Sequence, residues 1–113
     1  MPSVNKVILI GNVGRDPSIR YVDGQPVADL SLATTERARV SASGAEIPER
    51  TEWHRLVMWG KQADFAEKYI RKGTLLYVEG KLRTRIWEDR NTIKHSVTEI
   101  LVDTFDILSR PAQ

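Results

Sequence analysis

Residues 81–90, KLRTRIWEDR, combine one tryptophan with several cations at alternating positions. Successive side chains of a β-strand point to opposite faces, so Lys81, Arg83, Arg85 and Trp87 would share one face. An indole ring stacks on other flat π-systems, and a guanidinium binds phosphate or carboxylate through paired N–H donors. This face is therefore suited to a ligand that carries both planar rings and negative charge.

A second segment, TEWHRLVMWG, repeats the combination. Strand alternation places Trp53, Arg55 and Trp59 on one face and Leu56 and Met58 on the other. If the two tryptophans filled a protein core, Arg55 would be buried with them, and burying an unpaired guanidinium costs more free energy than indole packing returns. We therefore expect the tryptophans to face outward and the aliphatic side chains to supply the core.

The same argument assigns Leu82 and Ile86 to the core and leaves Trp87 outside. Outward tryptophans beside cations suit single-stranded nucleic acid, because each base stacks on an indole for about 1–3 kcal/mol whatever its identity, while cations neutralise the phosphates. Duplex DNA hides its base faces, and the sequence offers no helix suited to a major groove. Single strands are the predicted ligand.

Other chemistry has little support in the sequence. Because there is no cysteine, disulfides, thiolate metal sites and cysteine nucleophiles are excluded. Of the two histidines, we expect His54 to be a hydrogen-bonded residue at a packed interface or on the inner face, and His95 carries no signal. The acidic residues are dispersed, so we expect no metal, no cofactor and no enzymatic activity, although a metal-dependent nuclease is the rival from another class.

The composition describes one ordinary globular domain. The chain has 113 residues, of which 41% are hydrophobic and 28% charged, and a net charge of +2 permits an anionic partner without requiring one. No apolar run approaches the roughly 20 residues of a membrane span, and no secretory signal opens the chain. The expected location is the cytoplasm, with no membrane partner.

The elements that must position these side chains follow from hydrophobic periodicity and turn residues. A helix is expected over residues 61–72, with a buried stripe of Phe65, Ala66, Tyr69 and Ile70 and a stop at Gly73. Residues 35–50 are polar and small, which predicts a long mobile loop. Strands are expected at residues 7–10, 19–22, 27–35, 51–60, 74–87 and 92–108.

If the hairpin of residues 19–22 and 27–35 is counted as one element, the order is three strands, one helix and two strands. This order predicts a mostly β fold, a five-stranded Greek-key barrel of the OB type with one short helix between strands 3 and 4. A meander packed on one helix is the competing fold. The domain is expected to span residues 1–108, followed by a short C-terminal extension at 109–113 without an acidic tail.

The segments VNKVILIGNVGRDP, TEWHRLVMWGK, YIRKG and YVEGKLRTRIW, in this order, resemble the bacterial single-stranded DNA-binding protein family. The resemblance covers nearly the whole chain. It implies an OB-fold, a homotetramer built from dimers, and sequence-tolerant wrapping of single-stranded DNA in replication, recombination and repair, in the cytoplasm at the nucleoid. It also implies stacking roles for the three tryptophans and a subunit-interface position for His54. The cations that would contact phosphates are Lys6, Arg20, Arg55, Lys61, Lys72, Arg83 and Arg85, and strand alternation adds Lys81.

Two departures from the family pattern are visible. Where many relatives carry another aromatic residue after LATTE, this sequence reads Arg37, Ala38, Arg39, and we expect the two arginines to contact DNA in its place. Relatives usually continue into a linker with an acidic tip that recruits partner enzymes, so we expect this chain alone not to bind tail-reading enzymes. A primosomal or RNA-binding OB module is the alternative function within the binding proteins.

Overall fold

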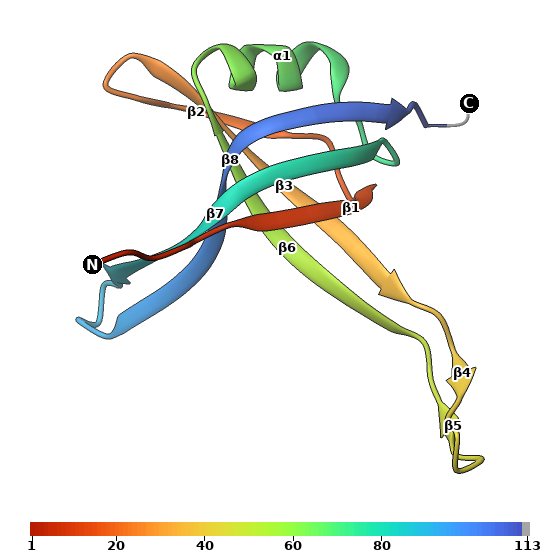
Figure 1. Ribbon diagram of the computed structural model, residues 1–113. Coiled ribbons are helices and arrows are strands. Elements are labelled where there is room, and N and C mark those ends of the chain that lie inside the picture. Colours follow the sequence, from red (N-terminus) through yellow and green to blue (C-terminus); the bar gives the residue numbers. More distant parts are fainter. Residues whose placement is uncertain (112–113) are drawn as a thin grey trace.

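The computed structural model describes residues 1–111 and consists of a β-barrel with one helix (Figure 1). Residues 112 and 113, the end of the expected 109–113 extension, lie outside the described residues. Within residues 1–111, no helix has the length and apolar character that a membrane crossing requires. The elements are β1 (Val7–Val13), β2 (Ser18–Val22), β3 (Gln25–Glu36), β4 (Arg39–Val40), β5 (Glu46–Ile47), β6 (Arg50–Trp59), α1 (Lys61–Tyr69), β7 (Leu75–Glu88) and β8 (Lys94–Ser109).

Five strands close into a ring in the order β1, β7, β8, β6, β3 and back to β1. The strand β2 pairs with the first part of β3, on the edge that β1 meets further along. All neighbours are antiparallel except β6 and β8. A simple meander has no parallel neighbours, so the competing fold is wrong. The structure confirms the five-stranded Greek-key barrel of the OB type with its helix between the third and fourth ring strands.

The ring has two short junctions. The parallel pairing of β6 with β8 spans two residue pairs, Leu56 with Ile100 and Val57 with Leu101. The pairing of β1 with β3 also spans two, at residues 12–13 of β1. By contrast, β3 and β6 pair over ten residues, and β7 and β8 over fourteen. The barrel is therefore two extensively paired sheets joined at two narrow places.

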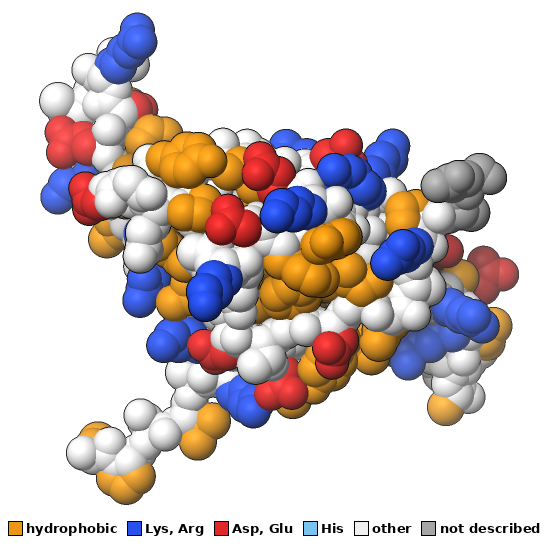
Figure 2. All heavy atoms as spheres, turned by 90° about the horizontal axis from the view of Figure 1, so that it is seen from above, with side chains coloured by type: hydrophobic (Ala, Val, Ile, Leu, Met, Phe, Trp, Pro, Cys, Tyr) orange, Lys and Arg blue, Asp and Glu red, His pale blue; other side chains and the backbone are white. Residues whose placement is uncertain are grey.

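The core is formed by the inward side chains of the strands, as their alternation predicts. Leu30, Leu32, Leu56 and Met58 are fully buried, and α1 covers one end of the barrel (Figure 1). Seen from that end, basic, acidic and hydrophobic side chains are interspersed over the surface (Figure 2). The end that carries α1 is therefore an ordinary mixed surface without a continuous basic field.

The helix differs from the expected one in length and in its buried stripe. It ends at Tyr69, because buried Ile70 is already extended, with φ −95° and ψ 129°. Ala63 and Ala66 face the core, while Phe65 and Tyr69 pack on each other at the surface, with ring centroids 4.7 Å apart. The buried side chains of α1 are therefore two alanines rather than the predicted aromatic stripe.

Residues 35–50, expected to be a mobile loop, form an arm instead. The strands β3 and β6 stay paired out to Glu36 and Arg50, and the short strands β4 and β5 continue the hairpin. A second arm is formed by the outer halves of β7 and β8, and both arms extend away from the α1 end (Figure 1). The loop prediction was wrong for residues 35–36, 39–40, 46–47 and 50, which pair through their backbones in a way that sequence polarity does not reveal. Residues 37–38, 41–45 and 48–49 lie outside strands, as expected.

The assignment of Leu82 and Ile86 to the core was also wrong. Their exposed fractions are 52% and 71%. Both residues lie in the second arm, beyond the point where β7 and β8 enclose the barrel core, so no opposing layer covers them. Strand alternation fixed which face they occupy, but not whether that face is covered.

Candidate nucleic-acid interface

The tryptophans of β6 face outward, as expected. Trp53 is 61% exposed and Trp59 is 38% exposed. Their partners across the strand pair are small, Ala33 opposite Trp53 and Val27 opposite Trp59. Because directly opposite side chains lie on the same side of a sheet, these small partners leave the indole rings uncovered.

The ring of Trp53 lies against the backbone of Gly14, just after β1. A Cβ atom added at Gly14 would overlap Cζ3 and Cη2 of the indole. The Gly14 N–H donates to the carbonyl of Ser31, 2.9 Å away, which fixes the backbone beneath the ring. The absence of a side chain at Gly14 therefore leaves the space that the Trp53 ring occupies.

Trp87 lies on the same exterior face, as the sheet register establishes. Val57 shares the face of Trp53 and pairs with Leu101 of β8, and Leu101 pairs with Lys81 of β7. Because alternate residues of a strand share a face, Trp87 lies on the same side of β7 as Lys81. Trp87 is 46% exposed. We call this surface the tryptophan face; its predicted members are Trp53, Arg55, Trp59, Lys81, Arg83, Arg85 and Trp87.

Trp87 has a partner that the sequence did not indicate. His95 of β8 lies opposite and stacks on it, with ring centroids 4.5 Å apart and an interplanar angle of 21°. The Nε2 atom of His95 lies 2.8 Å from Oδ2 of Asp89, whose Oδ1 accepts from the N–H groups of Asn91 and Ile93. The hydrogen bond to His95 is the first cause of a lowered pKa at Asp89. The β7–β8 turn thus holds His95 against Trp87.

Three arginines and two buried carboxylates form a continuous series of ion pairs across this face, which we call the arginine chain: Arg20, Asp29, Arg55, Glu99 and Arg85. Arg20 Nε lies 2.8 Å from Asp29 Oδ2, and Arg55 Nη2 lies 4.0 Å from Asp29 Oδ1. Arg55 Nε lies 3.5 Å from Glu99 Oε2, and Arg85 Nε lies 3.2 Å from Glu99 Oε1. The hydrogen bond to Asp29 raises the pKa of the Arg20 guanidinium. The three arginines were predicted as DNA-binding residues, whereas Asp29 and Glu99 were not.

Lys81 and Arg83 complete the cationic side of the tryptophan face. Both are exposed on β7, and neither forms an ion pair within the described part of the chain. Arg37 and Arg39 lie on the β3–β6 arm, where Arg39 belongs to β4. All four side chains are exposed; Lys81 and Arg83 share the strand face of Trp87, and Arg37 and Arg39 lie further out on the β3–β6 arm.

The remaining predicted cations lie elsewhere. Lys61 is the first residue of α1, and Lys72 follows the helix, where its backbone N–H donates to Asp16. Lys6 precedes β1, and its Nζ lies 2.9 Å from Glu79 of the first half of β7. The structure therefore does not bring Lys6 into the arginine chain.

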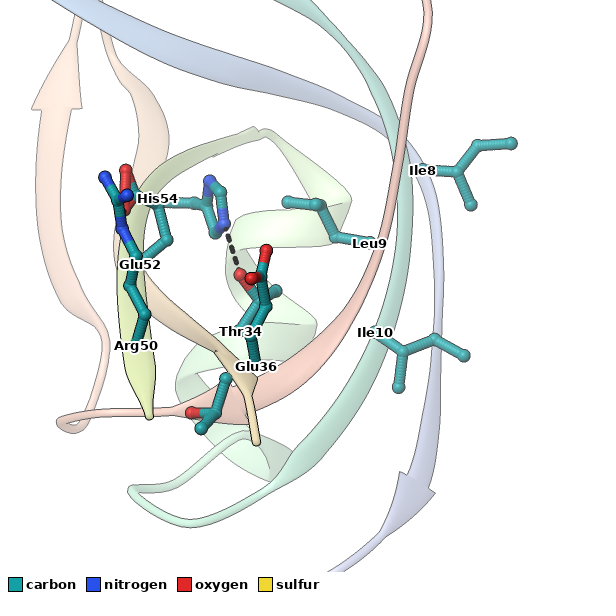
Figure 3. A pocket seen from close by; sticks show the side chains of 9 residues that line it. Ile8, Leu9, Ile10, Thr34, Glu36, Arg50, Glu52 and His54 are labelled. Carbon is teal, nitrogen blue, oxygen red and sulfur yellow. Dashed lines mark hydrogen bonds and ion pairs between the residues drawn. The ribbon is translucent and has the colours of Figure 1, made fainter. Parts of the chain in front are cut away.

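His54 lies on the inner side of β6, where its Nε2 is 2.8 Å from Oγ1 of Thr34. This confirms the expectation of a hydrogen-bonded histidine on the inner face. The two side chains line a cleft beside β1, and Leu9 points toward them while Ile8 and Ile10 point away (Figure 3). The cleft exists because β1 and β3 pair only at one end.

Comparison with known proteins places this geometry in one family. Residues 4–108 match the Single-strand binding protein family. A single-stranded DNA-binding protein of Bacteroides thetaiotaomicron is 52% identical over 108 residues, which are 95% of this chain and 67% of that protein. A solved Plasmodium falciparum SSB in complex with ssDNA is 36% identical and superposes with a TM-score of 0.85, covering 96% of this chain and 98% of that one. The family match over residues 4–108 and the 52% identical relative both support one conclusion, which the barrel fits: the chain belongs to the single-strand binding protein family.

Proposed function

We propose that this protein binds single-stranded DNA without strong sequence preference, by stacking bases on Trp53, Trp59 and Trp87 and by contacting phosphates through the surrounding cations. The observation that carries the proposal is the exposure of all three indoles on one continuous face that also carries arginines. Every base has a π-face, so stacking tolerates any sequence, and cations follow the backbone. The family membership and the DNA-bound structural relative support the same function.

The cations fall into two groups in this proposal. Lys81, Arg83 and Arg85 lie beside Trp87, and Arg20 and Arg55 extend the row across β2 and β6, so a strand that crosses the face would meet a cation near each ring. The second group lies outside the set of residues that defines the tryptophan face: Lys6, Arg37, Arg39, Lys61 and Lys72. Those five would contact DNA only where the strand continues beyond the tryptophan face.

A titration of labelled oligo(dT) with the purified protein tests the function. We expect a discrete complex, quenching of tryptophan emission by stacked bases, and weaker binding to a duplex of the same length. Oligo(rU) at matched length separates DNA from RNA preference, and tighter binding to the RNA would favour the RNA-binding alternative. Inclusion of Mg²⁺ tests the nuclease alternative, since shortening of the oligonucleotide would contradict a purely binding role.

Binding of this kind serves DNA wherever its strands are separated. We therefore expect the protein to act in replication, recombination and repair, at the bacterial nucleoid. Its family supports these roles.

We further propose that the protein assembles as a homotetramer built from dimers through β1. This strand pairs with β7 along residues 7–12 but with β3 only at residues 12–13, so one edge of its first half is unpaired in the described chain. Ile8 and Ile10 are 59% and 54% exposed and point away from the barrel (Figure 3). An unpaired edge with exposed isoleucines is suited to pairing with the same strand of a second copy.

Light scattering tests the assembly. We expect a mass near four times the 12.8 kDa of one chain at micromolar concentration. Ile10→Asp should lower that mass, because a charge would be buried at the paired edge, whereas Ile86→Asp in the second arm serves as a matched control and should not. A wild-type mass of one or two subunits would contradict the tetramer.

A further inference from the structure

Two carboxylates are buried in a surface that is otherwise suited to bind an anion. Asp29 and Glu99 have exposed fractions of only 8% and 6%, and both lie on the exterior side of their strands, among the arginines of the tryptophan face. Oδ1 of Asp29 and Oε2 of Glu99 have no hydrogen-bond partner in the described structure. A buried acidic group under a phosphate-binding face should weaken phosphate binding, so its presence needs a physical reason.

The geometry of the guanidiniums supplies that reason. In Arg20, Arg55 and Arg85 the Nε atom is the group nearest a carboxylate, at 2.8, 3.5 and 3.2 Å. The three side chains remain between 43% and 45% exposed. Each arginine is thus held by its Nε side, and much of its surface stays open to solvent.

The same ion pairs change the charge of the face. Three guanidiniums paired with two carboxylates keep a net charge of only +1, so this group of side chains attracts phosphate less than three unpaired arginines would. A carboxylate and a phosphate both bind guanidinium N–H groups. Because Asp29 and Glu99 hold the Nε side, a phosphate would bind the remaining N–H groups of an arginine whose positive charge is already partly neutralised.

We propose that Asp29 and Glu99 are internal competitors of the DNA phosphates: they position the three arginines in the free protein and lower both the affinity and the salt dependence of DNA binding. The inference rests on the proposed function. Neither carboxylate needs to contact DNA, so both are positioning residues. A residue that only supported the arginines would raise DNA affinity, whereas these two lower it. Removing the negative charge should strengthen binding.

The test is Glu99→Gln, measured with oligo(dT) over a series of NaCl concentrations. Glutamine keeps the size and one acceptor oxygen but removes the charge, which frees Arg55 and Arg85. We expect binding to tighten by roughly 3- to 10-fold, the effect of one unit charge several ångströms from a phosphate in a solvated site. The log–log salt slope should become more negative by about 0.7 for each additional phosphate that the freed arginines bind.

Glu67→Gln is the matched control. It makes the same change in net charge on the exposed surface of α1, and screening over that distance should leave affinity within about twofold of wild type. The double variant Glu99→Gln with Arg85→Ala should lose most of the increase in affinity, because one of the two freed guanidiniums is then missing.

The outcomes are separable. If wild type does not bind oligo(dT), the proposed function fails. If wild type binds but Glu99→Gln binds equally or more weakly, or if Glu67→Gln tightens binding as much, the competitor role is wrong. Should thermal melts show that Glu99→Gln does not fold, Asp29→Asn makes the same test through Arg20 and Arg55. If neither neutral variant folds, the carboxylates serve the fold and the inference is overturned.

Discussion

The imidazole of His95 stacks on the indole of Trp87, nearly parallel and 4.5 Å from it between ring centroids. One face of the indole is therefore covered, and a nucleobase can stack only on the other. The histidine is itself fixed by Asp89, which also accepts two backbone N–H groups of the turn. The arm thus presents Trp87 with a defined ring orientation before DNA arrives.

Removal of this support should weaken DNA binding while Trp87 is still present. We expect His95→Ala to lower affinity by about 2- to 12-fold, because an aromatic pair contributes about 0.5–1.5 kcal/mol and the free indole must be reordered on binding. His95→Phe keeps an aromatic partner and should restore most of the affinity. The measurement is an oligo(dT) titration in a background of Trp53→Phe and Trp59→Phe, where Trp87 is the only tryptophan. Equal affinity and equal emission in all three proteins would show that the stack has no role.

Trp87 itself should matter for binding and little for folding. Trp87→Ala should lose about 1–3 kcal/mol of binding free energy, roughly 5- to 150-fold in affinity, with a small change in melting temperature. Leu56→Ala, at a fully buried core position, should do the reverse and cost about 2–5 kcal/mol of folding stability. Thermal melts and DNA titrations on both variants check this. A large fall in melting temperature for Trp87→Ala with unchanged affinity would assign the indole to packing.

Gly14 should control the position of Trp53. An alanine there would overlap the indole ring, so Gly14→Ala should displace Trp53 and reduce DNA affinity toward that of Trp53→Ala. In the double variant the ring is gone and the methyl group has room. We therefore expect the double variant to bind and melt like Trp53→Ala alone. Additive losses in DNA affinity from the two changes would mean that Gly14 acts independently of the ring.

The contacts of Glu79 predict a pH dependence of stability. The Tyr77 hydroxyl donates to Glu79 Oε2 over 2.6 Å, and Lys6 Nζ lies 2.9 Å from Oε1. These contacts, with Tyr77 first, lower the pKa of Glu79 below its ordinary 4.5. A carboxylate with a lowered folded-state pKa stabilises the protein above its unfolded pKa, and that contribution is lost as pH falls through the folded value.

Glu79→Gln therefore should melt below wild type at neutral pH, and the difference should shrink as pH falls below about 4. Glu88→Gln is the matched control, because it makes the same change at the exposed end of β7 and removes none of these contacts. A difference between wild type and Glu79→Gln that stays constant from neutral to acidic pH would contradict the assigned contacts.

Sequence alternation was sufficient to place Trp53, Trp59 and Trp87 outside the barrel. The reason is physical: each tryptophan shares a strand face with an arginine, and a guanidinium strongly resists unpaired burial. The aliphatic residues on the other face of β6 were likewise placed correctly in the core. Alternation works where each face of a strand has one consistent environment.

Alternation could not find features that depend on which strands become neighbours. The ion pairs of Asp29 with Arg20 and of Glu99 with Arg85 require the register of β2 with β3 and of β7 with β8. The His95 stack requires the same β7–β8 register. Asp29 offered one usable signal, because alternation alone places it on the outer face of β3.

The two-pair junction between β6 and β8 has a consequence for how the bound protein moves. It joins the sheet that carries Trp53 and Trp59 to the sheet that carries Trp87, and Arg55 and Glu99 face each other across it. So short a ladder is where a closed barrel is expected to open locally. A DNA strand stacked on indoles from both sheets would span this junction from outside. Bound DNA should therefore slow local opening of the barrel between β6 and β8.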